Sequence, residues 1–79
     1  MKKNEYNYRS IDLSGLRCPI PVLRLKKELN KEKPGSYIKI FTTDPATVKD
    51  FEIFCEKTGD IIVESFNDSD KFVFIIKKK

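Results

Sequence analysis

Histidine is absent from this chain, and its absence removes whole classes of chemistry. The 79 residues include no His, no Trp and only two cysteines, Cys18 and Cys55. Catalysis by a serine or cysteine paired with an imidazole base is excluded, as is any metal site that uses histidine. The two cysteines are too far apart in the sequence for a Cys-x-x-Cys redox motif or a zinc-ligand pair. We therefore expect no metal and no cofactor, while a Cys18–Cys55 disulfide is not excluded.

A long apolar run is also missing. The longest, Phe72–Ile76, has the length of a strand, whereas a membrane span needs about 20 apolar residues. Lys2 and Lys3 precede the polar segment 4–9 instead of the apolar segment of an export signal. We therefore expect no membrane span, a cytoplasmic location and reduced thiols.

The length and composition limit the chain to one small globular unit. Its 79 residues are too few to close a second core, and 39% hydrophobic with 35% charged residues fits a folded domain better than a disordered segment. Residues 1–7 are polar, and we expect them to be flexible. A single domain is expected over residues 8–79.

The positive charge is concentrated in the first half of the sequence. Residues 1–39 hold ten Lys or Arg against four Asp or Glu, and residues 40–79 hold six against eight. Such an asymmetry suggests an acidic protein partner or the phosphates of a nucleic acid. An ordinary solvated lysine surface explains it equally well.

Hydrophobic spacing predicts six elements in the order β-α-β-α-β-β. Val22, Leu25 and Leu29 have helical spacing, and Gly59 stands where a left-handed residue ends a helix. The expected elements are a strand at 8–13, a helix from 18 to about 33, a strand at 37–41, a helix from 45 to about 58, and strands at 61–66 and 72–76. We expect an α+β fold, a two-layer α/β sandwich with a four-stranded mixed sheet and both helices on one face.

Two prolines follow Cys18 at the predicted start of the first helix. If Cys18 is the N-cap, Pro19 and Pro21 occupy positions whose amide hydrogens would lack an acceptor inside the helix. The amides of Cys18 and Ile20 then remain as free donors. Together with the helix dipole and Arg17, they are expected to lower the pKa of an accessible, nucleophilic Cys18.

Each of these residues also has an ordinary structural explanation. Cys18 could be a small buried residue, and Cys55, on the apolar stripe of the second helix, is expected in the core. Asp44 could act as an acid near Cys18, although capping of the second helix is the safer interpretation. The basic face of the first helix could dock an acidic partner or simply face solvent; it comprises Arg24, Lys27 and Lys31.

The segment Gly15–Val22 resembles the Cys-Pro-x-Pro signature of the TusA/SirA-like sulfur-carrier family. The resemblance extends to the opening of the second helix, Thr43–Thr47, and to the pair Phe54-Cys55. It covers nearly the whole chain from Ile11 to Lys77, and the order of elements is that of the family. One departure is Asp60, which follows Gly59 in a segment where many relatives carry a histidine.

Membership would imply that Cys18 accepts sulfane sulfur as a persulfide and relays it to an acceptor protein. The donor would be a cysteine desulfurase or a rhodanese-type enzyme, and the pathway tRNA thiolation, molybdenum-cofactor synthesis or thiosulfate and sulfur metabolism. Whether such a relay protein counts as an enzyme stays open, and direct contact with nucleic acid is not implied. The supporting residues would be Arg17, Pro19, Ile20, Pro21 and Asp44.

The alternative is a nucleic-acid-binding or regulatory module that acts through the basic first half. The net charge of +4 is modest, and no nucleic-acid-binding motif is recognisable. Binding of this kind would weaken steeply with salt and would not depend on Cys18.

Overall fold

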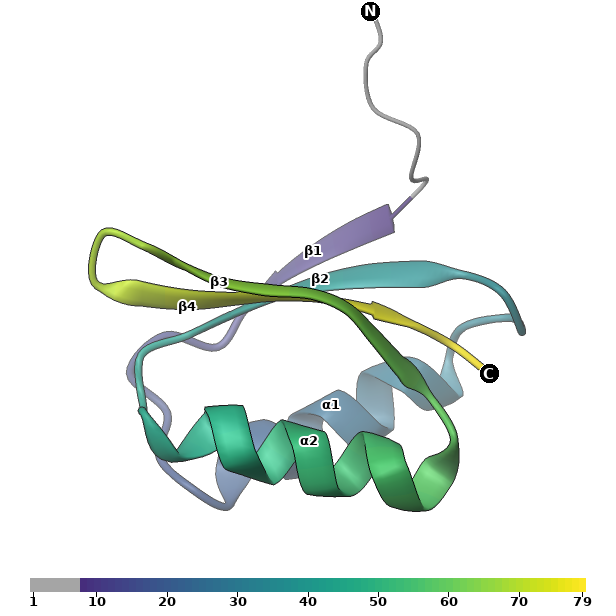
Figure 1. Ribbon diagram of the computed structural model, residues 1–79, viewed down its shortest axis with the longest axis horizontal. Coiled ribbons are helices and arrows are strands. Elements are labelled where there is room, and N and C mark those ends of the chain that lie inside the picture. Colours follow the sequence, from purple (N-terminus) through teal and green to yellow (C-terminus); the bar gives the residue numbers. More distant parts are fainter. Residues whose placement is uncertain (1–7) are drawn as a thin grey trace, which may run out of the picture.

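The computed structural model describes residues 8–79, so the flexibility expected for residues 1–7 lies outside the described part. The elements are β1 (Tyr8–Asp12), α1 (Ile20–Asn30), β2 (Tyr37–Thr42), α2 (Ala46–Thr58), β3 (Ile61–Asp68) and β4 (Lys71–Lys77). The predicted order of strands and helices is confirmed (Figure 1).

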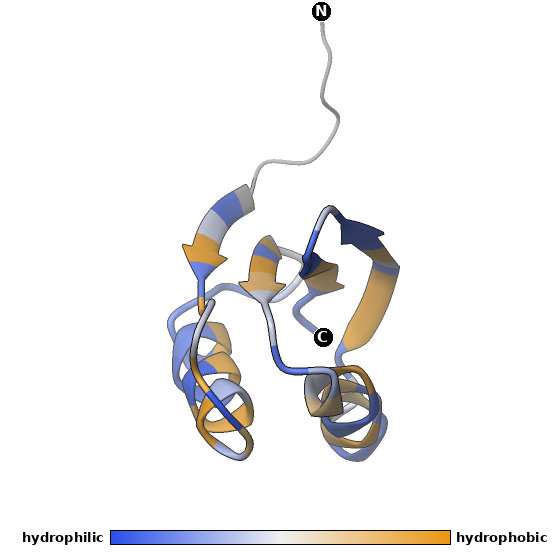
Figure 2. Cartoon of the chain, turned by 90° about the vertical axis from the view of Figure 1, so that its left-hand side faces the viewer, coloured by the Kyte–Doolittle hydropathy of each residue, from blue (hydrophilic) through white to orange (hydrophobic). Residues whose placement is uncertain are grey.

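The four strands form one mixed sheet in the order β1-β2-β4-β3. β1 pairs with β2 in parallel, whereas β4 pairs antiparallel with both β2 and β3. Both helices cover the same face of this sheet and lie side by side (Figures 1 and 2). The predicted two-layer α+β sandwich is therefore confirmed.

The core fills the space between the helices and the sheet. Leu25 of α1 and Phe51 of α2 are fully buried. Alternate residues of β2 are buried as well, and in β4 the continuous run 73–76 is buried. The rings of Phe51 and Phe74 meet with centroids 4.7 Å apart at an interplanar angle of 55°, a favourable tilted packing. Cys55 belongs to the same cluster, which confirms its predicted place in the core.

The ends of α2 are defined by local contacts. At its start the hydroxyls of Thr42 and Thr47, both buried, lie 2.7 Å apart, and Thr47 also donates to the carbonyl of Asp44. At its end Gly59 adopts φ 89° and donates its amide hydrogen to the carbonyl of Cys55, as predicted for a left-handed cap. The turn between β3 and β4 is tighter than predicted, because β3 continues to Asp68 and pairs there with Lys71.

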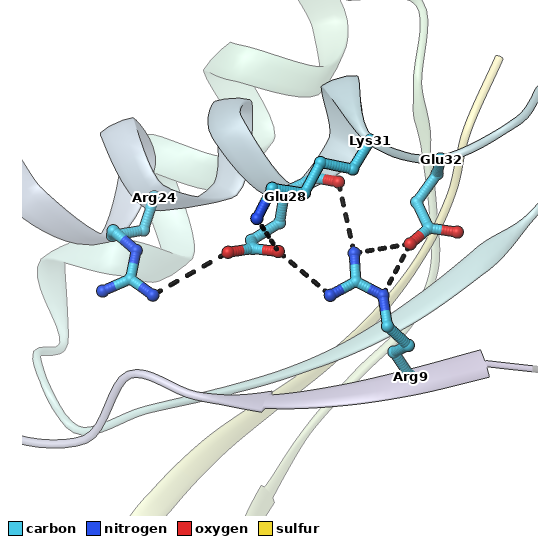
Figure 3. A network of polar contacts seen from close by, with 5 residues as sticks. All are labelled: Arg9, Arg24, Glu28, Lys31 and Glu32. Atoms are coloured by element: carbon cyan, nitrogen blue, oxygen red, sulfur yellow. Dashed lines mark hydrogen bonds and ion pairs between the residues drawn. The ribbon is translucent and has the colours of Figure 1, made fainter.

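An ion-pair network fastens β1 to α1 (Figure 3). The guanidinium of Arg9 contacts the carboxylates of Glu28 and Glu32, and Glu28 also lies near Arg24 and Lys31. Glu28 is only 6% exposed, and its pKa is lowered mainly by the hydrogen bond from Arg9. A carboxylate this well buried needs such partners to stay charged.

Glu28→Gln should destabilise the fold by about 1–2 kcal/mol at neutral pH, because a charge-assisted bond to half-exposed Arg9 is replaced by a neutral one. Folding lowers the pKa of Glu28 below its ordinary value of 4.5. The contribution is therefore complete above about pH 5 and is lost as the pH falls through the folded-state pKa. Urea unfolding at several pH values measures the difference between wild type and variant. A difference that persists unchanged at acid pH would contradict this role.

Candidate functional site

Cys18 lies in the segment between β1 and α1. Since β1 and β2 are parallel, the carboxyl ends of both strands lie at one edge of the sheet, and α1 and α2 both begin there. The sequence left open whether Cys18 was accessible or buried, and the structure places it at the surface. The starts of both helices therefore lie at the same edge of the sheet.

The predicted N-cap of α1 is wrong by one residue. The helix begins at Ile20, with Pro19 as its N-cap and Pro21 in its first turn, and the Cys18–Pro19 peptide bond is cis. The predicted free donors are both occupied. The amide of Ile20 donates to the carbonyl of Arg17 at 2.8 Å, and the amide of Cys18 donates to Oδ2 of Asp44 at 2.8 Å.

The expected lowering of the Cys18 pKa is also wrong. The pKa of this thiol is raised, first by hydrogen bonding to Asp50 and by desolvation, and then by the negative charges of Asp50 and Asp44. Two neighbouring carboxylates disfavour a thiolate, and the occupied amides cannot offset them. Sequence reasoning missed Asp50, because only the packing of α2 beside α1 brings it to Cys18.

Asp44 joins the two helix starts. Its Oδ2 accepts the amide hydrogen of Cys18, and its Oδ1 accepts that of Ala46 at 3.0 Å. These bonds, and the charge of Arg17, lower the pKa of Asp44. α2 begins at Ala46 with Pro45 as N-cap, one residue later than predicted. The side chain of Asp44 therefore stabilises the turn that precedes the helix. The carboxylate thus fixes the backbone of Cys18, a contact that the capping interpretation did not include.

A groove of about 310 Å³ opens beside Cys18, between the first turn of α1 and one side of α2. Its lining is mainly apolar and consists of Cys18, Pro19, Val22, Asp50, Ile53, Phe54 and Lys57. Ile20 and Leu23, on α1, are 44% and 56% exposed, and Ile53 is 42% exposed. Exposed apolar side chains on the helices that form a groove are typical of a contact surface. The sequence pattern did not reveal it, since these residues lie outside the core stripes.

The predicted basic face of α1 is exposed but does not line this groove. Arg24 and Lys31 flank Glu28 at 3.8 and 3.7 Å, so both take part in the network of Figure 3. Lys27 is exposed in the last turn of α1. Part of the positive charge noted in the sequence therefore neutralises carboxylates within the fold.

The second thiol has a different environment. Cys55 is buried, and desolvation raises its pKa to about 12. Both cysteines are free thiols. Within residues 8–79, no three His, Cys, Asp or Glu side chains gather as a metal site would require, and neither helix is long and apolar enough to cross a membrane.

Comparison with known proteins agrees with this arrangement. The profile of the family described as "Sulfurtransferase TusA" matches residues 9–78. The chain belongs to the TusA family. It is 46% identical over 70 residues to the sulfur carrier protein TusA of Allochromatium vinosum, covering 89% of this chain and 92% of that protein. It is 35% identical over 69 residues to the sulfur carrier protein TusA of Pseudomonas aeruginosa, covering 87% of each.

The fold agrees with the family as well. The crystal structure of a SirA-like protein from Desulfitobacterium hafniense matches with a TM-score of 0.76 at 25% identity, covering 87% of this chain and 95% of that one. The family resemblance inferred from the sequence is thus confirmed. Membership of the TusA family supports a role as a sulfur carrier, and a carrier has a sulfur donor and a sulfur acceptor as partners.

Proposed function

We propose that Cys18 accepts sulfane sulfur as a persulfide from a donor protein and relays it to an acceptor protein. The observation that supports this most is the position of Cys18, an exposed thiol at an apolar groove in a TusA-family fold, while the second thiol, Cys55, is buried. A transferable sulfur has to be reachable by two partners in turn, and Cys55 is not.

Loading is a sulfur transfer without net oxidation. The Cys18 sulfur, as thiolate, attacks the outer sulfur of the donor's persulfide, a new S–S bond forms on Cys18, and the donor's S–S bond breaks. The donor leaves as a thiolate and takes up the proton that Cys18 lost. Delivery to the acceptor is the same exchange with Cys18 as the leaving thiol. No metal, imidazole or external oxidant is required.

The neighbouring residues position this sulfur. Asp44 fixes the amide of Cys18, Pro19 is the N-cap of α1, and Ile20 and Pro21 belong to its first turn. The backbone hydrogen bonds from Cys18 and Ala46 mainly lower the pKa of Asp44, and the charge of Arg17 adds to this effect. We assign these residues to shaping the loop, with the chemistry on Cys18 alone.

The basic face of α1 is proposed to guide an acidic surface of the partner toward the groove. Of its three residues, Arg24 and Lys31 are partly neutralised by Glu28, so Lys27 should contribute most to attraction. Complementary charge mainly accelerates association and is weakened by salt.

Lys27→Glu should therefore slow loading by a cysteine desulfurase at low ionic strength and leave loading by glutathione persulfide unchanged. Lys33→Glu is the matched control, because it makes the same charge change beyond the end of α1. Cold cyanolysis, which releases sulfane sulfur as thiocyanate, measures loading in each case. Equal effects of the two variants would contradict docking through this face.

Relay of a persulfide sulfur would serve tRNA thiolation, molybdenum-cofactor synthesis or thiosulfate and other sulfur metabolism. The proposed location of this relay is the cytoplasm. The donor class distinguishes among these routes. Loading by a desulfurase with cysteine and loading by a rhodanese with thiosulfate are therefore to be compared on the same protein.

A further inference from the structure

Asp50 is the residue near Cys18 whose placement is not explained by the fold. It lies on α2, directly before the core residue Phe51, and lines the groove together with Cys18. Its Oδ2 atom is buried and has no hydrogen-bond partner among residues 8–79. A buried carboxylate oxygen without a hydrogen-bond donor lowers the stability of the fold. A carboxylate at this position is therefore better explained by function than by stability.

The groove supplies no cation that satisfies this oxygen. Lys57 lines the same groove, yet the ion pairs formed within residues 8–79 do not include Asp50. The thiol of Cys18 does not satisfy this oxygen either, because Oδ2 has no hydrogen-bond partner among residues 8–79. The position thus combines a negative charge beside the reacting sulfur with a groove-lining carboxylate that no cation of residues 8–79 neutralises.

The charges around Cys18 come from each segment packed against it. Asp50 and Lys57 belong to α2, Asp44 belongs to the turn between β2 and α2, and Arg17 precedes Cys18 in its own loop. Asp44 is already occupied by two amides. Asp50 is therefore the charge near the thiol that a partner can still neutralise.

The geometry points to Asp50 as a positioning residue that keeps Cys18 a protonated, unreactive thiol in the free carrier and is neutralised when the donor protein places a cationic side chain in the groove beside this carboxylate. The inference rests on the proposed function and adds selectivity to it. A carrier with a permanently reactive thiolate would react with any small persulfide or oxidant. A carrier restrained in this way loads only where the sulfur-donor protein supplies a cationic side chain beside Asp50.

Two observations favour a cationic group of the donor as the occupant. The carboxylate lines a mainly apolar groove and forms no ion pair within residues 8–79, so a cation placed in the groove is attracted strongly once water is excluded. The helices that form the groove also carry exposed apolar residues that a protein segment can cover, Ile20 and Leu23 on α1 and Ile53 on α2. Glutathione persulfide has two carboxylates against one ammonium group and is too small to cover these side chains, which makes the restraint specific for a protein.

The test is Asp50→Asn, which removes the charge and keeps the shape. Removing the carboxylate should lower the pKa of Cys18 and shift the pH profile of iodoacetamide alkylation to lower pH. At neutral pH the rate should rise by about threefold for each unit of that shift, because the tenfold gain in thiolate is partly offset by lower nucleophilicity. Asp50→Glu should retain the wild-type profile. Glu52→Gln, an exposed residue on the same helix, is the control.

Sulfur transfer supplies the second measurement. Asp50→Asn should accelerate loading by glutathione persulfide and reduce the preference for a desulfurase over that small donor. If Asp50 were instead a base that removes the thiol proton, the variant would load more slowly from both donors, and the proposal would be overturned. An unchanged alkylation profile would overturn it as well. Alkylation needs no sulfur donor, so it tests Asp50 even if the proposed relay function fails.

Discussion

Cys18→Ser should abolish sulfur loading, whereas Cys55→Ser should load as the wild type does. A serine oxygen can neither attack a persulfide nor hold sulfane sulfur, and Cys18 is the exposed thiol of the described structure. Cys55 is buried and its pKa is raised to about 12, so it carries almost no thiolate at neutral pH. The expected loss is therefore complete for one variant and negligible for the other.

The measurement is alkylation with a reagent that marks persulfides, followed by a gel that separates marked from unmarked protein. Thermal unfolding of both variants controls for folding, because Cys55→Ser places a hydroxyl in the core and lowers stability somewhat. Equal labelling of the Cys18 variant, or loss of labelling in the Cys55 variant while it is folded, would contradict the assignment.

Phe51→Ala should destabilise the fold by about 3–5 kcal/mol, the usual range for removing a buried aromatic ring. Phe51 is fully buried and packs against Phe74, so the ring joins α2 to the central strand β4. A chain of this size has a total stability of only about 4–12 kcal/mol. Loading by a desulfurase should fall together with the folded fraction, because α2 forms one side of the groove beside Cys18.

Urea unfolding measures this loss, and Phe66→Ala is the matched control. Phe66 lies on β3 and is 42% exposed, so its truncation should cost about 1 kcal/mol or less. If Phe51→Ala were no more destabilising than Phe66→Ala, the packing described for α2 would be wrong.

The fold could be predicted almost entirely from local signals. Helical spacing placed Leu25 and Leu29 in the core, and the position of Gly59 at the end of α2 predicted its left-handed conformation. These features depend on neighbours within the same element, so the sequence contains what is needed to infer them. The mixed sheet followed from the order of elements, since a parallel strand pair accommodates the intervening helix.

The site could be predicted only in part, because its properties arise between elements. The sequence left open whether Cys18 is exposed and whether Asp44 lies near it. The structure answers both, because Cys18 lies at the surface and its amide binds Asp44 across 26 residues of sequence. Asp50 reaches the thiol only because α2 packs beside α1. The pKa of Cys18 is therefore raised, whereas the helix start considered alone predicted that it would be lowered.

Intact mass spectrometry of the reduced wild-type protein, after incubation with a cysteine desulfurase and cysteine, tests the central claim most directly. The account predicts a gain equal to the mass of one sulfur atom, removed by dithiothreitol and located on Cys18 by fragmentation. A parallel sample with thiosulfate and a rhodanese identifies the donor class. A folded protein with a freely alkylated Cys18 that gains no sulfur from either donor would contradict the account.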